Sequence, residues 1–112
     1  MELLPPLDAG EIPAGVPNHY VEQLRVPTMS VGRYLVPSNG HDDQLPHAED
    51  EVYVVIAGRG VLARTDGGGE RIPLDPGSAV FVPAGERHRF VDVTEDLEVL
   101  AFLSPPYSGR PE

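Results

Sequence analysis

The chain has 112 residues, 40% of them hydrophobic, which is enough to bury one core and too few for two domains. It contains no cysteine, so disulfides and thiolate ligands are excluded, and a metal ion would have to be held by histidine and carboxylate side chains. The formal net charge of −10, with only 8 scattered basic residues, would repel a phosphate backbone, so we expect no nucleic acid partner.

The start of the chain has no basic leader, and its only apolar run is cut by Pro5 and Pro6. Nowhere do about 18 apolar residues follow one another, as a membrane-spanning helix requires. We therefore expect a cytoplasmic protein that does not contact a membrane.

Short strands joined by tight turns are predicted throughout, because 13 prolines and 12 glycines leave no room for helices of ordinary length. In chain order the expected strands are 19–26, 28–36, 51–56, 60–65, 70–74, 78–82, 87–93 and 97–103. Eight strands on this length indicate an all-β sandwich or small barrel. Glycines at 58–60 and 66–69 predict hairpin turns. The Pro-rich ends, 1–18 and 104–112, are expected to lie extended on the surface.

Two segments bring histidines towards a carboxylate. His47 and Glu51 are four residues apart, so in an extended chain their side chains point to the same face. His88 follows a turn at Gly85 and should fold back beside the strand that ends at residue 82. Two imidazoles and one carboxylate form a facial ligand set with open positions, which suits iron(II) best and can also hold zinc.

The same two segments resemble the two sequence motifs of the cupin superfamily. The second motif matches at its fixed positions, which are Gly77, Pro83, Gly85 and His88, with Asp92 where the family commonly has asparagine. The first matches in its second half, at His47, Glu51 and Gly58.

This resemblance implies a double-stranded β-helix, a jelly-roll β-barrel, with residues 1–112 as a single cupin domain. It also implies a divalent transition metal held by His47, Glu51 and His88, with iron(II) favoured and manganese, zinc, nickel or copper as alternatives. Small cupins further suggest a homodimer, in which the strand near Tyr20 to Val26 takes part.

The first motif departs from the family at position 45, where a second histidine is usual and this chain has Leu45. Gln44 could supply a fourth, weaker ligand if Pro46 bends the chain and turns the amide oxygen inward. His41 is a second candidate, and a site with three protein ligands is the third alternative. We expect Gln44 to be the better placed of the two side chains.

Residues around the ligands have expected places as well. Tyr53 and Val55 share the face of Glu51 and should line the cavity together with Phe90, mainly as packing, whereas Val52, Val54 and Ile56 should face away from it. Tyr53 and Glu51 are the candidate catalytic groups. The acidic run Asp42, Asp43, Glu49 and Asp50 is expected to be a solvated loop. Arg33 could point inward and bind an anionic substrate, or lie on the surface, and His19 is expected to be an ordinary strand or surface residue.

A fold hosts many reactions, so the resemblance implies a metal pocket without naming the chemistry. The first hypothesis is an oxidoreductase of the dioxygenase type acting on a small oxygen-rich molecule. The second is a nonoxidative sugar isomerase, epimerase or lyase, in which Tyr53 or a carboxylate moves a proton. The third is a small-ligand binding or sensing module without catalysis.

Overall fold

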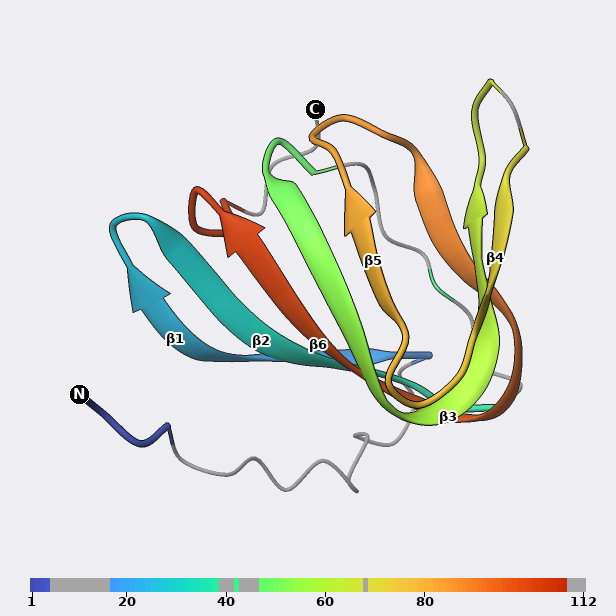
Figure 1. Ribbon diagram of the computed structural model, residues 1–112, viewed down its shortest axis with the longest axis horizontal. Helices are drawn as coiled ribbons and strands as arrows, with labels where there is room; N and C mark the ends of the chain where they lie inside the picture. Colours follow the sequence, from blue (N-terminus) through green and yellow to red (C-terminus); the bar gives the residue numbers. More distant parts are fainter. Residues whose placement is uncertain (5–16, 39–41, 43–46, 68, 109–112) are drawn as a thin grey trace.

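The computed structural model describes residues 1–4, 17–38, 42, 47–67 and 69–108. They form one antiparallel sheet in the order β1-β2-β6-β3-β4, with β5 also paired to β3 (Figure 1). The strands are β1 (His19–Val26), β2 (Met29–Val36), β3 (Asp50–Arg64), β4 (Arg71–Leu74), β5 (Ala79–Val82) and β6 (His88–Ser104). No described residue is helical, which confirms the all-β prediction, and no described segment could therefore cross a membrane as a helix.

The two longest strands, β3 and β6, replace four of the predicted ones. Strands predicted at 51–56 and 60–65 are one continuous strand, and so are those predicted at 87–93 and 97–103. The hairpin turn predicted at 58–60 is therefore wrong. Gly58 lies inside β3 with a φ of +88°, where the register with β6 shifts. Such irregularities bend a strand. Figure 1 shows that β3 and β6 both curve, so that the C-terminal half of β3, the N-terminal half of β6 and β4 form a second wall.

The turn predicted at 66–69 is confirmed as the connection between β3 and β4. Gly67 and Gly69 have φ values of +53° and +63°, which glycine adopts without steric cost. The amide of Arg64 donates to the carbonyl of Glu70 at 2.8 Å and starts the ladder between the two strands.

The core lies inside the curved sheet and is built from alternate residues of its strands. Its fully buried side chains come from four strands, so that no single hairpin could form it; they include Val36, Tyr53, Val55, Leu74, Leu97 and Val99. Val52, Val54 and Ile56 occupy the opposite face of β3, as predicted, and Ile56 is 42% exposed.

Part of the acidic run is buried, so the prediction of a solvated loop is wrong for two of its members. Asp42 accepts hydrogen bonds from the Tyr34 hydroxyl and the Phe90 amide, both at 2.8 Å. Glu49 is 3% exposed. Asp50 is exposed and accepts from the Ala84 amide at 2.9 Å, while Asp43 lies outside the described residues.

Hydrogen bonds attach the C-terminal tail to the sheet as far as it is described, and Tyr107 is partly buried, although most of residues 104–108 are exposed, as predicted. The Tyr107 amide donates to Ser30 Oγ at 2.8 Å, and the side chain of Arg25 donates to the Tyr107 carbonyl at 2.5 Å. Ser108 donates to Glu49 at 2.9 Å. These bonds attach the segment after β6 to β1, β2 and the loop before β3. Residues 5–16 and 109–112 lie outside the described part of the chain.

The edge of the sheet at β1 offers a surface for pairing with a second copy of the chain. Among the described strands β1 pairs with β2 alone, and an edge strand offers unpaired backbone groups to a second chain. We propose a homodimer formed along Tyr20 to Val26. Light scattering at micromolar concentration should give twice the chain mass of 12.1 kDa, and a monomer mass would reject the proposal.

Candidate metal centre

The three predicted ligands come from two segments that the fold joins directly. His47 precedes β3, Glu51 is the second residue of that strand, and His88 is the first residue of β6. Gly85, with a φ of +81°, forms the turn before His88, and its amide donates to the His47 carbonyl at 2.8 Å. This backbone hydrogen bond connects the two motifs at the point where their side chains meet.

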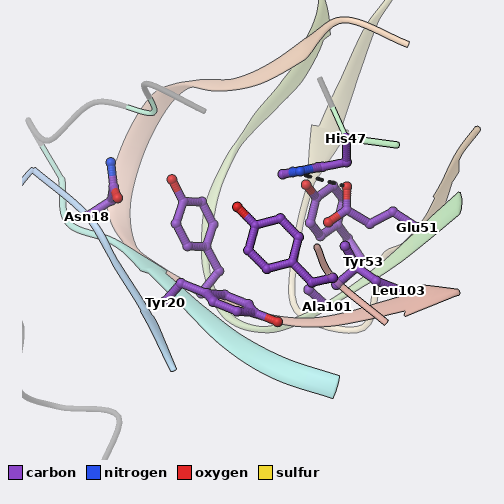
Figure 2. Close-up of a pocket in the computed structure, with 9 residues that line it drawn as sticks. Asn18, Tyr20, His47, Glu51, Tyr53, Ala101 and Leu103 are labelled. Atoms are coloured by element: carbon purple, nitrogen blue, oxygen red, sulfur yellow. Dashed lines mark ion pairs between the residues drawn. The ribbon is translucent and has the colours of Figure 1, made fainter. Parts of the chain in front are cut away.

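One nitrogen or oxygen atom from each of His47, Glu51 and His88 lies within 4.8 Å of the other two. Glu51 Oε1 is 3.4 Å from His88 Nε2. It is 3.9 Å from His47 Nε2 (Figure 2). Glu51 and His88 are 4% and 6% exposed. The structure therefore brings together the three residues that the motifs predicted as a ligand set.

The donor set fits a divalent cation. Glu51 Oε1 is buried and has no hydrogen-bond partner, an arrangement that costs free energy unless a cation or proton satisfies the oxygen. His88 Nδ1 lies 2.8 Å from the Glu86 carbonyl, which can only accept, so this nitrogen carries the proton. In the neutral ring Nε2 then carries the lone pair that could bind a metal, and it faces Glu51. A carbonyl that orients a histidine in this way is typical of metal sites.

Tyr53 lies beside the same group. Its hydroxyl is 3.0 Å from His88 Nε2, and it donates that hydrogen bond when the imidazole is neutral. The hydroxyl thus contacts the centre from β3, two residues after Glu51, where the strand period predicts it.

Metal affinity should depend on pH through His88. Burial of its ring lowers the pKa, but the Glu51 carboxylate and the Glu86 carbonyl raise it more, so the pKa lies above its ordinary value of 6.5. A proton on Nε2 excludes a metal ion, so zinc affinity should fall as the pH is lowered through the raised pKa, by about tenfold for each pH unit below it. Competition titrations with a chromophoric chelator between pH 5.5 and 8 would measure this, and a constant affinity would contradict histidine ligation.

A cavity of about 270 Å³ opens against this centre. All four tyrosines of the chain line it, together with five other residues: Asn18, His47, Glu51, Ala101 and Leu103. Figure 2 shows Tyr20 across the cavity from His47 and Glu51. His88 is not part of the wall and reaches the centre next to Tyr53 and Glu51. Of the predicted wall residues Tyr53 is confirmed, whereas Val55 and Phe90 belong to the core.

Sequence reasoning missed Tyr20, Tyr34 and Tyr107 as wall residues. Tyr20 and Tyr34 are directly paired between β1 and β2, and Tyr107 arrives from the tail through long-range hydrogen bonds. Pairing of the adjacent strands 19–26 and 28–36 as a hairpin could have placed the first two side by side. No local pattern indicates the position of Tyr107.

Two other candidates lie away from the cavity. Arg33 is half-buried and pairs with Glu98 at 2.8 Å, so it does not serve as the predicted anion-binding group. His19 is an ordinary residue of β1, as expected. Gln44, His41 and Leu45 lie outside the described residues.

The prediction for Gln44 is tested by substitution. Gln44→Ala should weaken zinc binding by a modest factor of about 3 to 10, since a neutral amide is a weaker ligand than imidazole or carboxylate. Gln44→His should restore or tighten binding. His41→Ala is the matched comparison, and unchanged affinity in Gln44→Ala would leave three protein ligands.

Comparison with known proteins agrees with this architecture. The uncharacterized protein SCO3923 of Streptomyces coelicolor is 45% identical over 89 residues, which cover 80% of this chain and 82% of that protein. An RmlC-like cupin from Desulfovibrio desulfuricans has a similar structure, with a TM-score of 0.75, 18% identity and coverage of 95% and 98% of the two chains. A cupin 2 conserved barrel domain protein from Salinispora arenicola gives a TM-score of 0.71 at 24% identity, covering 92% and 87%.

The family model of the cupin domain matches residues 32–103, which include both motifs and the three candidate ligands. This match covers more than half of the chain and agrees with the antiparallel barrel architecture. The chain therefore belongs to the cupin family.

Proposed function

We propose that the protein is a metal-dependent enzyme of the dioxygenase type that acts on a small oxygen-rich molecule. One observation carries the proposal: two imidazoles and one buried carboxylate with an unpartnered oxygen converge beside an aromatic cavity. Two histidines and one carboxylate leave several positions of an octahedral ion open, which is the ligand pattern of nonhaem iron(II) oxygenases.

His47, Glu51 and His88 would hold the metal, and iron(II) fits this donor set best. When bound, it would supply Lewis-acid and redox chemistry to the cavity. The chain's own groups have distinct tasks. The Glu86 carbonyl holds the His88 ring in one tautomer, the tyrosines line the approach to the centre, and the Tyr53 hydroxyl holds a proton next to the reacting groups.

The composition of the wall favours oxygenation over isomerisation. Glu51 is the only carboxylate among the described wall residues, and it is assigned to the metal. An isomerase requires a positioned base that is not a ligand. The described wall offers only phenols and an amide besides the ligands, which provides few groups for repeated proton transfer.

Tyr53 supports a second candidate, a lyase or isomerase. Its hydroxyl lies 3.0 Å from His88 Nε2, so it could donate or receive one proton at the substrate. A protein that consumes no oxygen but converts its substrate only with metal and Tyr53 present would belong to this class. Binding without turnover would indicate the third class, a sensing module.

Nitric oxide tests the open positions without knowledge of the substrate. Protein loaded anaerobically with iron(II) should give a high-spin iron–nitrosyl signal in electron paramagnetic resonance, since nitric oxide occupies the position of oxygen. Glu51→Gln should reduce both iron content and signal, while Ile56→Ala on the outer face should change neither. Oxygen uptake with a panel of catechols, enediols and hydroxyketones would follow. Iron-loaded protein without a nitrosyl signal would overturn the dioxygenase assignment.

A further inference from the structure

The aromatic wall of the cavity is assembled from the whole fold. Tyr20 comes from β1, Tyr34 from β2, Tyr53 from β3 and Tyr107 from the segment after β6. The Tyr20 ring centroid is 5.8 Å from that of Tyr107 at an interplanar angle of 74°, and 6.4 Å from that of Tyr34 at 58°. Figure 2 shows Tyr20 across the cavity from Glu51, whereas the Tyr107 ring lies edge-on to His47, with centroids 5.2 Å apart.

Tyr20 is fitted closely to the sheet. A Cβ atom on Gly32 would come within 2.3 Å of the Tyr20 ring, so the ring lies directly over the backbone of β2. Its hydroxyl is buried and has no hydrogen-bond partner. The position of this ring is therefore set by the fold before any ligand is present.

Carboxyl groups lie near these rings, and Arg25, which contacts the Tyr107 carbonyl, is itself paired with Glu22. No arginine or lysine belongs to the described wall, which contains Glu51, and Glu49 is buried next to the tail with Oε1 unpartnered. Burial, Glu49 and Glu51 raise the pKa of Tyr107, and burial, Glu22 and Glu51 raise that of Tyr20. Both phenols therefore remain neutral near pH 7.

The hydrogen bond of the Tyr34 hydroxyl makes the aromatic wall more electron-rich. It donates to the buried carboxyl of Asp42 at 2.8 Å. A phenol that donates to an anionic oxygen has a more electron-rich ring, and the face of such a ring attracts positive charge. The wall thus offers electron-rich rings and, among the described residues, no basic group of the kind that an anionic substrate would need.

We propose that the cavity takes a small organic cation, such as a quaternary ammonium group, against Tyr20, Tyr34 and Tyr107. Aromatic faces with nearby carboxyl groups are a recognised environment for such groups. The inference deepens the proposed function, on which one part of it rests: an oxygen atom of the same molecule would extend to the centre formed by His47, Glu51 and His88. The cavity volume of about 270 Å³ suits a molecule of this size.

Choline and 3,3-dimethylbutan-1-ol form the matched pair of probes, because they have the same shape and only choline carries a positive charge. The chain has no tryptophan and all four tyrosines line the cavity, so tyrosine fluorescence reports occupancy directly. In metal-free protein choline should bind at least about tenfold more tightly than the alcohol. Equal affinity, or no response to choline at millimolar concentration, would overturn the proposal.

Two substitutions at one position separate the ring from the hydroxyl. Tyr107→Phe should change choline affinity less than about twofold, while Tyr107→Leu should weaken it roughly 5- to 30-fold. The pair Tyr20→Phe and Tyr20→Leu repeats the test on another strand, in case the tail of the first leucine variant is displaced. Phe81→Leu, at an outer position that is 61% exposed, is the control. Equal losses in the phenylalanine and leucine variants would reject cation binding by the rings.

The two proposals fail separately. Choline binding in metal-free protein together with iron-loaded protein that gives no nitrosyl signal rejects the dioxygenase and retains the cation site. If the protein takes up oxygen with neutral substrates and does not bind choline, the cation site is rejected and the dioxygenase proposal is retained.

Discussion

Replacing His88 by alanine is expected to remove metal binding almost completely. Its ring supplies one of three donor atoms, and the Glu86 carbonyl already holds the ring in the tautomer that presents Nε2 to Glu51. Loss of an outer-shell partner alone costs about 10- to 100-fold in metal affinity, so loss of this ligand should exceed 100-fold. Elemental analysis of protein purified without an affinity tag, followed by zinc titration, would measure the effect.

His19→Ala is the matched control, since it removes an imidazole from β1 that does not line the cavity. Its metal content should equal that of the parent. Thermal unfolding of all variants with and without zinc separates lost ligation from lost folding, because zinc should raise the melting temperature of the parent and of His19→Ala only. A zinc-induced shift of normal size in His88→Ala would refute the assignment of the centre.

The stability of the metal-free protein should depend on pH in the opposite sense to its metal affinity. Because the pKa of His88 is raised in the folded state, protonation of this ring stabilises the fold. The contribution is complete below the ordinary value of 6.5 and is lost as pH rises through the raised pKa. Metal binding removes the same proton, so the two measurements together identify one group.

The ligand centre was predictable because its parts are local in sequence. His47 and Glu51 share a face through the strand period, and the turn at Gly85 places His88 beside them. The fixed glycines of the motifs are positions of backbone geometry: Gly77 and Gly85 both have positive φ. Asp92, where the family commonly has asparagine, has a φ of +49°, a conformation that these two residue types tolerate.

The wall of the cavity was less predictable because it depends on contacts between distant segments. Tyr107 reaches the cavity through the bond to Ser30, 77 residues away in the chain. Asp42 was assigned to solvent from its acidic neighbours, yet Tyr34 and Phe90 satisfy its carboxyl in the interior. Composition describes a segment's average preference, whereas burial of a single carboxyl depends on partners that the fold supplies.

Strand boundaries were misjudged at glycines for a related reason. A pair of glycines can mark a hairpin or an irregular position within a strand, and the local sequence is the same in both cases. Partners on β6 decide the outcome for Gly58: Ala57 pairs with Glu98 and Arg59 with Glu95, so the ladder continues past it.

Gly58→Ala is expected to destabilise the fold strongly. Its φ of +88° is strained for any residue with a side chain, and an added Cβ would lie 2.1 Å from the Asp96 carbonyl oxygen and 2.8 Å from Leu97 Cα. Relief would require β6 to move at Leu97, which is 1% exposed in the core. Backbone strain and overpacking together should cost about 3 to 5 kcal/mol. The melting temperature should fall by roughly 15 °C.

Gly77→Ala separates the two causes, because Gly77 has a similar φ of +94° and nothing within 4 Å of an added Cβ. It therefore carries the strain without the clash and should cost only about 1 to 2 kcal/mol in urea unfolding. Equal losses in the two variants would mean that β6 yields at Asp96 without cost. A much larger loss at Gly58 would show that the close approach of β3 to β6 holds the bend, which shapes the barrel around the candidate centre.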